Sequence, residues 1–402
     1  MIEIKENFGT QLYKDGVAQE DNLIVLTEDQ KRAVGEIINW YAERYSISFK
    51  KYFTLAGSAG TGKSSIIQCI IDNLDINKAD VLCGALTGKA TLNLRRKGND
   101  GSNTLHSALY DCIFTKDGPI FTLKSKIYYK LIIIDEASMI SEEMFNDIMS
   151  FGIPTIFIGD HCQLPPIEGK FNIMLTPDCT LTQIHRQAAE SPIIQASQKA
   201  INGKEIEFTG PDFQCDFRKI KESELKEEDF LWADQIVCGF NKTRKALNAL
   251  CREIRGFNKP YPEFGERMVV LKNNRFYNVF NGQIIYLRST PVFDHSFKTW
   301  NCRFIDELEH QGGILALVGQ EKNIIYKLQD PPLSEKRRDN SKVAYLDYGY
   351  VLSVHKAQGS GWDKVMVYDE NFGFGDKDTY KRWLYTAITR AKKEVLLVEP
   401  EG

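Results

Sequence analysis

A glycine-rich segment near the start of the chain most constrains its fold, because residues 57–65 read GSAGTGKSS. The segment follows a short apolar run, KYFTLAG, which is typical of a buried strand, and it precedes SSIIQCIIDNL, which has the apolar spacing of a helix. The runs ADVLCGAL, YKLIIIDEA and PTIFIGD are also short, apolar and β-rich, with helical patterns between them. Buried strands that alternate with helices favour a parallel sheet covered on both faces.

The length of 402 residues favours two domains. We expect an α/β core at residues 1–178, which begins with a helix capped by Thr27, and a second α/β core at residues 179–402. The second core would take its strands from DQIVCGF, YGYVLSVH, DKVMVYDE and EVLLVEP. Each core carries an expected insertion, a β-hairpin within residues 104–128 and a small β-barrel at about residues 257–345. The barrel is indicated by short segments with Asn-Gly and Gly-Gly turns: MVVLKNN, VFNGQIIYLRS, KTWNCRFIDE, GGILALVGQ and NIIYKLQ.

The glycine-rich segment matches the P-loop, in which backbone N–H groups after a strand surround the phosphates of a nucleotide. Lys63 would reach the outer phosphates, and the Ser64 hydroxyl would bind Mg²⁺. A glycine turn before a helix with a surface lysine is the alternative, but the strand–loop–helix context favours a nucleotide site. The predicted nucleotide-binding residues of the segment are Gly57, Ala59, Gly60, Thr61, Gly62, Lys63, Ser64 and Ser65.

Two later strands run into polar residues, in IIIDEAS and in IFIGDHCQLPP. Open α/β sheets bind ligands at the carboxyl ends of their strands, so these side chains are candidates for the same site. Asp135 would hold Mg²⁺, commonly through water, and Glu136 would orient and deprotonate an attacking water. Asp160 and Gln163 follow the later strand, and Gln163 would sense the γ-phosphate. An acidic pair that only caps the next helix is the alternative for Asp135 and Glu136.

Besides the P-loop, eight segments in chain order resemble the motifs of superfamily 1 DNA helicases, in the branch of RecD and the phage Dda helicases. They are LTEDQ, GALTGKA, TLHSAL, DEAS, GDHCQLPP, LTQIHRQ, SVHKAQG and YTAITRAKKEV, and the last two are quite specific. The resemblance covers nearly the whole chain. It implies two RecA-like cores that clamp ATP and Mg²⁺ between them, a DNA strand that lies across both cores, and 5′-to-3′ movement along that strand.

The resemblance also assigns roles to single residues of the nucleotide site. Gln30 would read adenine, and Arg186 would contact the γ-phosphate. Gln358 and Arg390 fall at ATP-facing positions, where Arg390 would act as an arginine finger in cis. Gly361 departs from the family, which often has an acidic residue there that touches the ribose, so that contact alone is not carried over.

Sequence-independent binding of a DNA strand needs phosphate contacts and stacking surfaces. Candidates lie on both cores, although a solvated polar residue or a helix cap is the alternative for each of them: Thr87, Lys89, Thr104, His106, Asn241, Lys242, Ser353, His355 and Lys356. His106 and His355 are favoured because they lie inside segments that resemble the family's motifs, whereas for Lys89 or Lys242 alone the alternative is preferred. Phe121, in the predicted hairpin, resembles the aromatic residue that stacks on the split base pair in the family's strand-separating pin. Packing of Phe114 and Phe121 on the core is the alternative. The barrel would grip DNA or couple to the pin.

Composition limits the class of protein without identifying it. A net charge of −3 argues against a basic protein that coats DNA, but a local basic groove remains compatible with it. No run of about 18 apolar residues predicts a membrane span, and the first residues lack the pattern of a secretion signal. Nine scattered cysteines without a CxxC pair predict reduced thiols rather than disulfides or zinc. We therefore expect a cytoplasmic protein, in the bacterial host if the chain is phage-encoded.

The sequence thus predicts a helicase of replication, recombination or repair that binds single-stranded and forked DNA and acts as a monomer. A single-strand binding protein and other replication or recombination proteins are candidate partners. A DNA-dependent ATPase clamp or remodelling subunit that does not unwind is the main alternative. A small-molecule kinase would share only the P-loop and would leave GDHCQLPP, AQG and AITRA unexplained.

Overall fold

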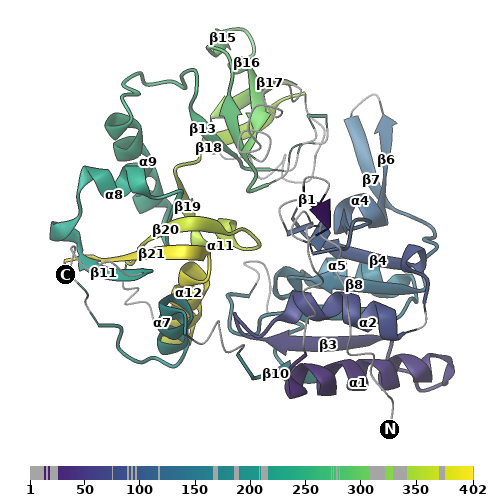
Figure 1. The fold of residues 1–402 in the computed structure, drawn as a ribbon. Helices are drawn as coiled ribbons and strands as arrows, with labels where there is room; N and C mark the ends of the chain where they lie inside the picture. Colours follow the sequence, from purple (N-terminus) through teal and green to yellow (C-terminus); the bar gives the residue numbers. More distant parts are fainter. Residues whose placement is uncertain are drawn as a thin grey trace. The chain divides into compact units, whose positions relative to one another are not determined.

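The computed structural model describes residues 13–14, 17–18 and 26–401. Within the last range it leaves out residues 75, 88–89, 92–93, 96, 116–117, 166–170, 185–189, 208, 210–215, 273, 275, 278, 280, 308–321, 329–341 and 371–375. Contacts divide the chain into two units (Figure 1). The first comprises residues 1–110 and 123–198, and the second comprises residues 111–122 and 199–402.

The first unit is built on a parallel six-stranded sheet in the order β10-β3-β9-β8-β4-β5. Its strands are β3 (Tyr52–Gly57), β4 (Val81–Ala85), β5 (Asn103–Thr104), β8 (Leu131–Asp135), β9 (Thr155–Gly159) and β10 (Cys179–Leu181). Its helices are α1 (Glu28–Ala42), α2 (Ile67–Asn73), α4 (Leu105–Leu109) and α5 (Glu142–Ser150). Single 3₁₀ turns are η1 (Glu43–Tyr45), η2 (Lys63–Ile66), η3 (Lys78–Asp80) and η4 (Ala137–Met139).

Strand β8 explains why this sheet is covered on both faces. Successive side chains of a strand point to opposite faces, and here both sets are apolar. Leu131 and Ile133 join a buried cluster with residues of α1 and α2. Ile132 and Ile134 join a second cluster with residues of α4 and α5. Helix α1 begins as the sequence predicts, because the Thr27 side chain accepts a hydrogen bond from the backbone N–H of Gln30.

The second unit contains a parallel five-stranded sheet in the order β11-β21-β20-β12-β19. Its strands are β11 (Phe217–Lys221), β12 (Gln235–Cys238), β19 (Val351–Ser353), β20 (Trp362–Tyr368) and β21 (Ala391–Glu399). Its helical elements are η5 (Glu222–Glu224), α8 (Glu227–Trp232), α9 (Asn241–Ile254), α11 (Val354–Ala357) and α12 (Lys377–Ile388). Helix α7 (Pro192–Ile201) spans the division between the units.

A closed barrel of five strands interrupts the second unit between α9 and β19. The ring runs β14-β13-β18-β17-β16 and closes because β14 also pairs with β16. The pairing of β17 with β18 is parallel, and the other pairings of the ring are antiparallel. β15 extends the barrel by pairing with β16. The strands are β13 (Arg267–Val270), β14 (Ile284–Leu287), β15 (Val292–Asp294), β16 (Thr299–Asp306), β17 (Lys322–Leu328) and β18 (Ala344–Tyr348).

Two further strand pairs lie outside the three sheets. β6 (Tyr110–Thr115) pairs with β7 (Gly118–Leu123), where the sequence predicts a hairpin, and β1 (Tyr13–Lys14) pairs with β2 (Val17–Ala18). The parallel sheets, the hairpin and the barrel therefore confirm the predicted fold class. The segment GGILALVGQ lies outside the described residues. Among the described helices, none has the length and apolar character needed to cross a membrane.

The first contact-defined unit extends beyond residue 178, where the sequence predicts the boundary between the cores. Strand β10 pairs in parallel with β3 of the first sheet, so the first unit continues to Gln198. The strand has only three residues, which is too short for an apolar pattern to reveal its partner. By its contacts, the hairpin segment at residues 111–122 belongs to the second unit. The sequence predicts this segment as an insertion in the first core.

Gly349 joins the barrel to the second sheet and offers a test of this packing. A Cβ atom there would lie 2.9 Å from the backbone carbonyl carbon of Met268 and 3.1 Å from its oxygen. Backbone atoms cannot move aside cheaply, so Gly349→Ala should lower the free energy of unfolding by about 1–3 kcal/mol. Gly101→Ala is the control, because a Cβ atom there meets nothing within 4 Å.

Denaturant titration followed by tryptophan fluorescence measures this difference, since four of the five tryptophans lie in the second unit. Equal transition midpoints for the two variants would contradict the close packing at Gly349.

Candidate functional site

The predicted nucleotide-binding loop lies at the carboxyl edge of the first sheet. It leaves β3 at Gly57 and enters η2 at Lys63, so the first turn of the following helix is a 3₁₀ turn rather than an α-helical one. Gly60 and Gly62 have φ angles of 82° and 75°, in the left-handed region that favours glycine. A Cβ atom on Gly57 would lie 2.6 Å from the Thr61 hydroxyl oxygen. The loop therefore requires its glycines, as a backbone cradle for phosphates does.

Lys63 and Asp160 bring opposite charges together at the ends of neighbouring strands. The Lys63 ammonium donates to the carbonyl oxygens of Gly57 at 2.6 Å and Ser58 at 2.9 Å. It also lies 3.7 Å from a carboxylate oxygen of Asp160, whose side chain is only 1% exposed. The Gln163 amide donates to the same oxygen at 3.4 Å, so both predicted polar residues after β9 face the lysine.

Asp135 and Glu136 occupy the end of β8, the next strand in the sheet after β9. The backbone N–H of Glu136 donates to the Asp135 carboxylate at 2.9 Å. Glu136 has a φ angle of 56°, and a left-handed conformation at a residue other than glycine costs about 1–3 kcal/mol. Burial, with the negative charge of Asp135, raises the pKa of the nearby Cys83 thiol to about 12, so this cysteine stays protonated.

The chemistry of these donors fits a nucleotide with Mg²⁺. Ser64 lies in η2, half-exposed beside Lys63, and Asp135 retains a second carboxylate oxygen. Hydroxyl and carboxylate oxygens suit this hard cation. Asp160, His161 and Cys162 also bring potential ligand atoms within 4.8 Å of one another, but Asp160 already faces the Lys63 ammonium, so we assign no metal to them.

Gln30 is buried beneath the loop, with 1% of its surface exposed. Its amide nitrogen donates to the carbonyl oxygen of Thr61 at 3.1 Å, and its amide oxygen accepts from the backbone N–H of Thr27 at 3.0 Å. The side chain therefore links the start of α1 to the P-loop. Sequence reasoning connects Gln30 with adenine but misses its hydrogen bond to Thr61, because the two residues are 31 positions apart in the chain.

Gln358 and Arg390 are both buried in the second unit. Gln358 ends α11, and Arg390 precedes β21. The Arg390 guanidinium donates to the carbonyl oxygens of Thr386 at 2.9 Å and Ser360 at 3.1 Å, and to the Thr389 hydroxyl at 3.2 Å. Its partners are neutral, and within the described part of the chain no carboxylate forms an ion pair with it. A Cβ atom on Gly361 would lie 3.3 Å from the Arg390 carbonyl oxygen, which leaves little room for a larger residue.

Two candidates for DNA binding in the first unit accept hydrogen bonds from backbone N–H groups three residues further along the chain. The Thr87 hydroxyl oxygen accepts from the backbone N–H of Ala90 at 3.2 Å. The Thr104 hydroxyl oxygen accepts from the backbone N–H of Ser107 at 3.4 Å and caps α4. His106, in α4, stacks on Tyr110 with ring centroids 5.8 Å apart. These local hydrogen bonds are compatible with both the cap and the DNA contact that the sequence left open for the two threonines.

In the second unit, Asn241 and Lys242 open α9, and Lys242 is exposed. The Glu370 carboxylate accepts from the backbone N–H groups of Gly239 at 2.6 Å and Phe240 at 2.7 Å, and it also contacts the Thr243 hydroxyl. Sequence reasoning could not predict that Glu370 contacts the start of α9, because it lies 131 residues from Gly239 along the chain.

Ser353, His355 and Lys356 lie at α11. Burial lowers the pKa of His355, which favours its neutral form. Three of the predicted site residues cannot be placed. Lys89 and Arg186 lie outside the described residues, and Phe121 belongs to β7 but its side chain is also outside them.

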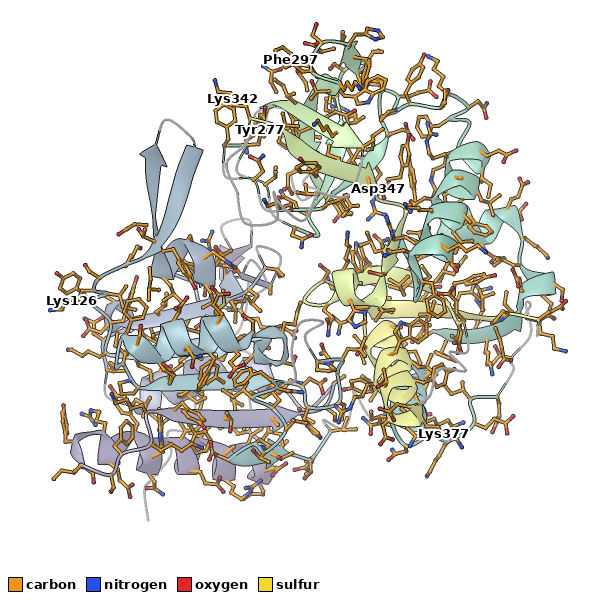
Figure 2. All side chains as sticks on the ribbon, turned by 180° about the vertical axis from the view of Figure 1, so that it is seen from behind. Lys126, Tyr277, Phe297, Lys342, Asp347 and Lys377 are labelled. Carbon is orange, nitrogen blue, oxygen red and sulfur yellow. The ribbon has the colours of Figure 1, made fainter. Side chains whose placement is uncertain are left out.

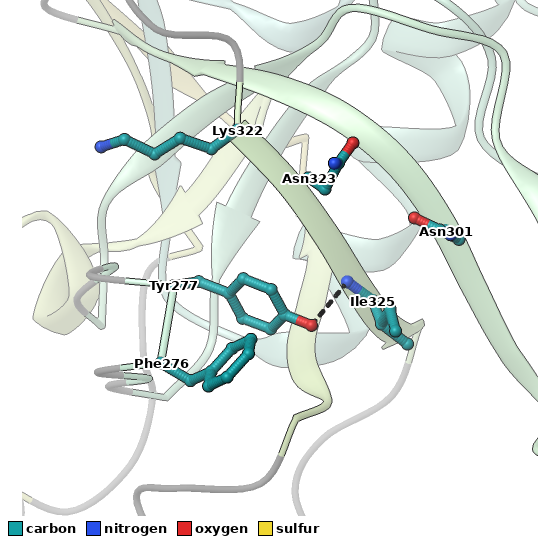
Figure 3. A pocket seen from close by; sticks show the side chains of 6 residues that line it. All are labelled: Phe276, Tyr277, Asn301, Lys322, Asn323 and Ile325. Atoms are coloured by element: carbon teal, nitrogen blue, oxygen red, sulfur yellow. Dashed lines mark hydrogen bonds between the residues drawn. The ribbon is translucent and has the colours of Figure 1, made fainter.

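The barrel carries a pocket of about 440 Å³, shown in Figure 3. An exposed ring, Phe276, stands beside Tyr277, whose hydroxyl donates to the Lys342 carbonyl oxygen and accepts from the backbone N–H of Ile325 at 3.1 Å. Polar side chains complete the lining: Asn301, Lys322 and Asn323.

Family models match both units. The AAA domain matches residues 25–212, and the UvrD-like helicase C-terminal domain matches residues 348–398. The chain is 24% identical to the ATP-dependent RecD2 DNA helicase of Deinococcus radiodurans over 84% of its own length, but it spans only 45% of that relative. It is 23% identical to the ATP-dependent DNA helicase Dda of phage T4, with 93% of this chain and 99% of Dda covered.

Solved structures agree on the fold. A Pif1 helicase from a study of unwinding at forked duplex DNA matches with a TM-score of 0.52 and 17% identity, covering 93% of this chain and 92% of that one. Bacteroides Pif1 bound to single-stranded DNA matches with a TM-score of 0.50 and 15% identity over the same shares. Together the two family models and the similarity to RecD2 and Dda support a superfamily 1 helicase of the RecD, Dda and Pif1 type.

Proposed function

We propose that this protein is an ATP-dependent DNA helicase that moves along single-stranded DNA and unwinds duplex. The observation that carries the proposal is the carboxyl edge of the first sheet. There the P-loop lysine, the acidic pair of β8 and the Asp160–Gln163 loop follow three adjacent parallel strands. The match to Dda over 99% of that helicase supports the same assignment for the chain as a whole.

The residues of this edge divide the work of ATP hydrolysis. Lys63 exchanges the loop carbonyls for phosphate oxygens, and Ser64 with Asp135 holds Mg²⁺. The cation neutralises charge on the phosphates when it is bound. Glu136 orients and deprotonates the attacking water. Gln163 senses the γ-phosphate beside Asp160.

Residues beyond the first sheet complete the cycle. Arg186 contacts the γ-phosphate, and Arg390 stabilises charge on it. Gln358 lies two residues before Ser360, whose carbonyl oxygen accepts from Arg390. Hydrogen bonds to neutral acceptors hold the Arg390 guanidinium in place, which supports this role. Gln30 contacts adenine. Because its amide also holds the Thr61 carbonyl oxygen, we propose that adenine binding changes the position of the P-loop.

The DNA strand runs over both units, which act as the two RecA-like cores with the barrel as an accessory. Thr87, Lys89, Thr104 and His106 contact it from the first core. Asn241, Lys242, Ser353, His355 and Lys356 contact it from the second core. The aromatic and amide-lined pocket of the barrel supports a grip on the same strand. The protein acts as a monomer, alongside single-strand binding or recombination proteins.

Glu136→Gln should retain ATP binding but lower DNA-stimulated hydrolysis by about a hundredfold or more, because the amide cannot accept the proton of the attacking water. Lys63→Ala should abolish hydrolysis through the loss of a phosphate contact. Phosphate release and fluorescent-nucleotide binding, each with and without single-stranded DNA, separate the two effects. Glu143→Gln, at an exposed position of α5, is the matched control. Normal turnover in Glu136→Gln would remove this residue from its role.

Phe121→Ala should impair unwinding more than translocation on single strands or DNA-stimulated hydrolysis, because a pin acts only at the fork. The three rates are measured on the same preparation, with Phe114→Ala as the companion variant in the other strand of the hairpin. Equal losses in all three assays would instead identify Phe121 as a packing residue.

The direction of movement should be 5′-to-3′, so a duplex with a 5′ single-stranded tail should be unwound and one with a 3′ tail left intact. The proposal rests on the TLHSAL segment, the short hairpin and the barrel before SVHKAQG, which occur together in the RecD and Dda branch. Strand-displacement assays on the two tailed duplexes decide it. Unwinding of the 3′-tailed duplex alone would reverse the direction without affecting the helicase assignment, and translocation without unwinding of either would favour a clamp or remodelling subunit.

A further inference from the structure

A second pocket, of about 510 Å³, lies in the first unit away from the nucleotide site. One side is formed by Asn103 of β5 and Ser107 of α4, and the other by the segment after β7, with Lys124, Lys126 and Tyr128. The volume falls within the range of about 300–1,000 Å³ that is usual for small-ligand sites. Its lining is polar, basic and aromatic, which none of the roles proposed above explains.

The segment after β7 is attached to α4, and buried and exposed side chains alternate along it. Lys124 fastens it to α4, because the ammonium donates to the Ala108 carbonyl oxygen at 2.9 Å and the backbone N–H donates to the Leu109 carbonyl oxygen at 2.9 Å. Ile127 is buried, while Lys126 and Tyr128 on either side of it are exposed. This alternation places the charge and the ring of the two flanking residues in solvent together.

Lys126 and Tyr128 contact each other. The Lys126 ammonium lies 5.0 Å from the centre of the Tyr128 ring, and 82% of Tyr128 is exposed. Figure 2 shows Lys126 projecting from the surface of the first unit. A cation–π contact at an exposed site is weak, so it orients the ammonium without neutralising it. A positive charge beside an exposed ring is the combination that binds a nucleic-acid strand without regard to sequence.

The position of the pocket supports a nucleic-acid ligand. Asn103 and Ser107 flank Thr104 and His106, which belong to the segment proposed to contact the DNA strand. The segment after β7 also follows directly on the proposed strand-separating hairpin. A strand that passes Thr104 can therefore reach Lys126 within the same unit.

We propose that this pocket binds the sugar–phosphate backbone of a DNA strand, with the Lys126 ammonium on a phosphate and the Tyr128 ring against the neighbouring sugar or base. The inference rests on the proposed function and adds a contact beyond the helicase motifs. The strand can come from unpaired DNA or from the duplex at a fork, since both present the same phosphodiester.

The test measures equilibrium binding of the full chain to a single strand, a blunt duplex and a fork over a series of salt concentrations. Loss of one phosphate contact lowers the slope of log affinity against log salt by about 0.7 on single strands or about 0.9 on duplex. Lys126→Ala should lower the slope by about 0.7 if the pocket binds unpaired DNA and by about 0.9 if it binds duplex. Lys126→Arg should restore the slope, because arginine keeps the positive charge. Tyr128→Ala should weaken binding by about fivefold or more where a base stacks.

Two control variants match these changes at residues that do not line the pocket. Lys51→Ala removes an exposed lysine that precedes β3, at the amino edge of the sheet. Tyr45→Ala removes a tyrosine that is 85% exposed and lies under the Arg44 guanidinium at 4.4 Å. If the wild-type chain binds DNA and the pocket variants match these controls on all three substrates, the pocket assignment is overturned. Absence of DNA binding by the wild-type chain would overturn the proposed function as well.

Discussion

The Lys63 ammonium touches the carbonyl oxygens at the end of β3 and faces the Asp160 carboxylate after β9 at 3.7 Å. This contact exists because the two strands are parallel neighbours, so their carboxyl ends meet at one edge of the sheet. Asp135 reaches the same edge from β8, which pairs with β9. The register of three strands therefore sets the separation of the cation from the acids. With Asp160 almost fully buried, loss of Lys63 would leave a charge without its partner, which is costly in a protein interior.

The elements that could be predicted from sequence are those whose pattern has a local cause. Apolar runs such as YKLIIIDEA must be buried on both faces, and the Asn-Gly turn at residues 281–282 precedes strand β14 of the barrel. What could not be predicted depends on partners far along the chain. β10 has three residues and belongs to the first sheet only through β3, and the contact of Gln30 with Thr61 requires α1 to be in place. Thr87 and Thr104 fit both a cap and a DNA contact, and sequence alone cannot separate the two.

Buried ion pairs tie the barrel to the second sheet. Arg244 of α9 pairs with Asp347 of β18 at 2.7 Å, and Arg252 of the same helix pairs with Glu266 at 2.6 Å. Such pairs add little net stability over apolar packing, because both charges must leave water. Their hydrogen-bond geometry is directional, however, so they favour one orientation of the barrel on α9. A grip on DNA by the barrel pocket would need that fixed orientation in order to transmit force to the core.

The barrel's incoming and outgoing strands are neighbours. β13 and β18 pair in antiparallel fashion, with Val269 opposite Asp347, so the chain leaves the second core and returns to it at nearly the same place. Closure of the ring through β14 and β16 also satisfies its strand edges without help from the core. The segment from β13 to β18 therefore forms an insertion whose strands pair with one another. Chain length can be gained, lost or exchanged within it without opening the parallel sheet that precedes and follows it, so the barrel can diversify while that sheet stays the same.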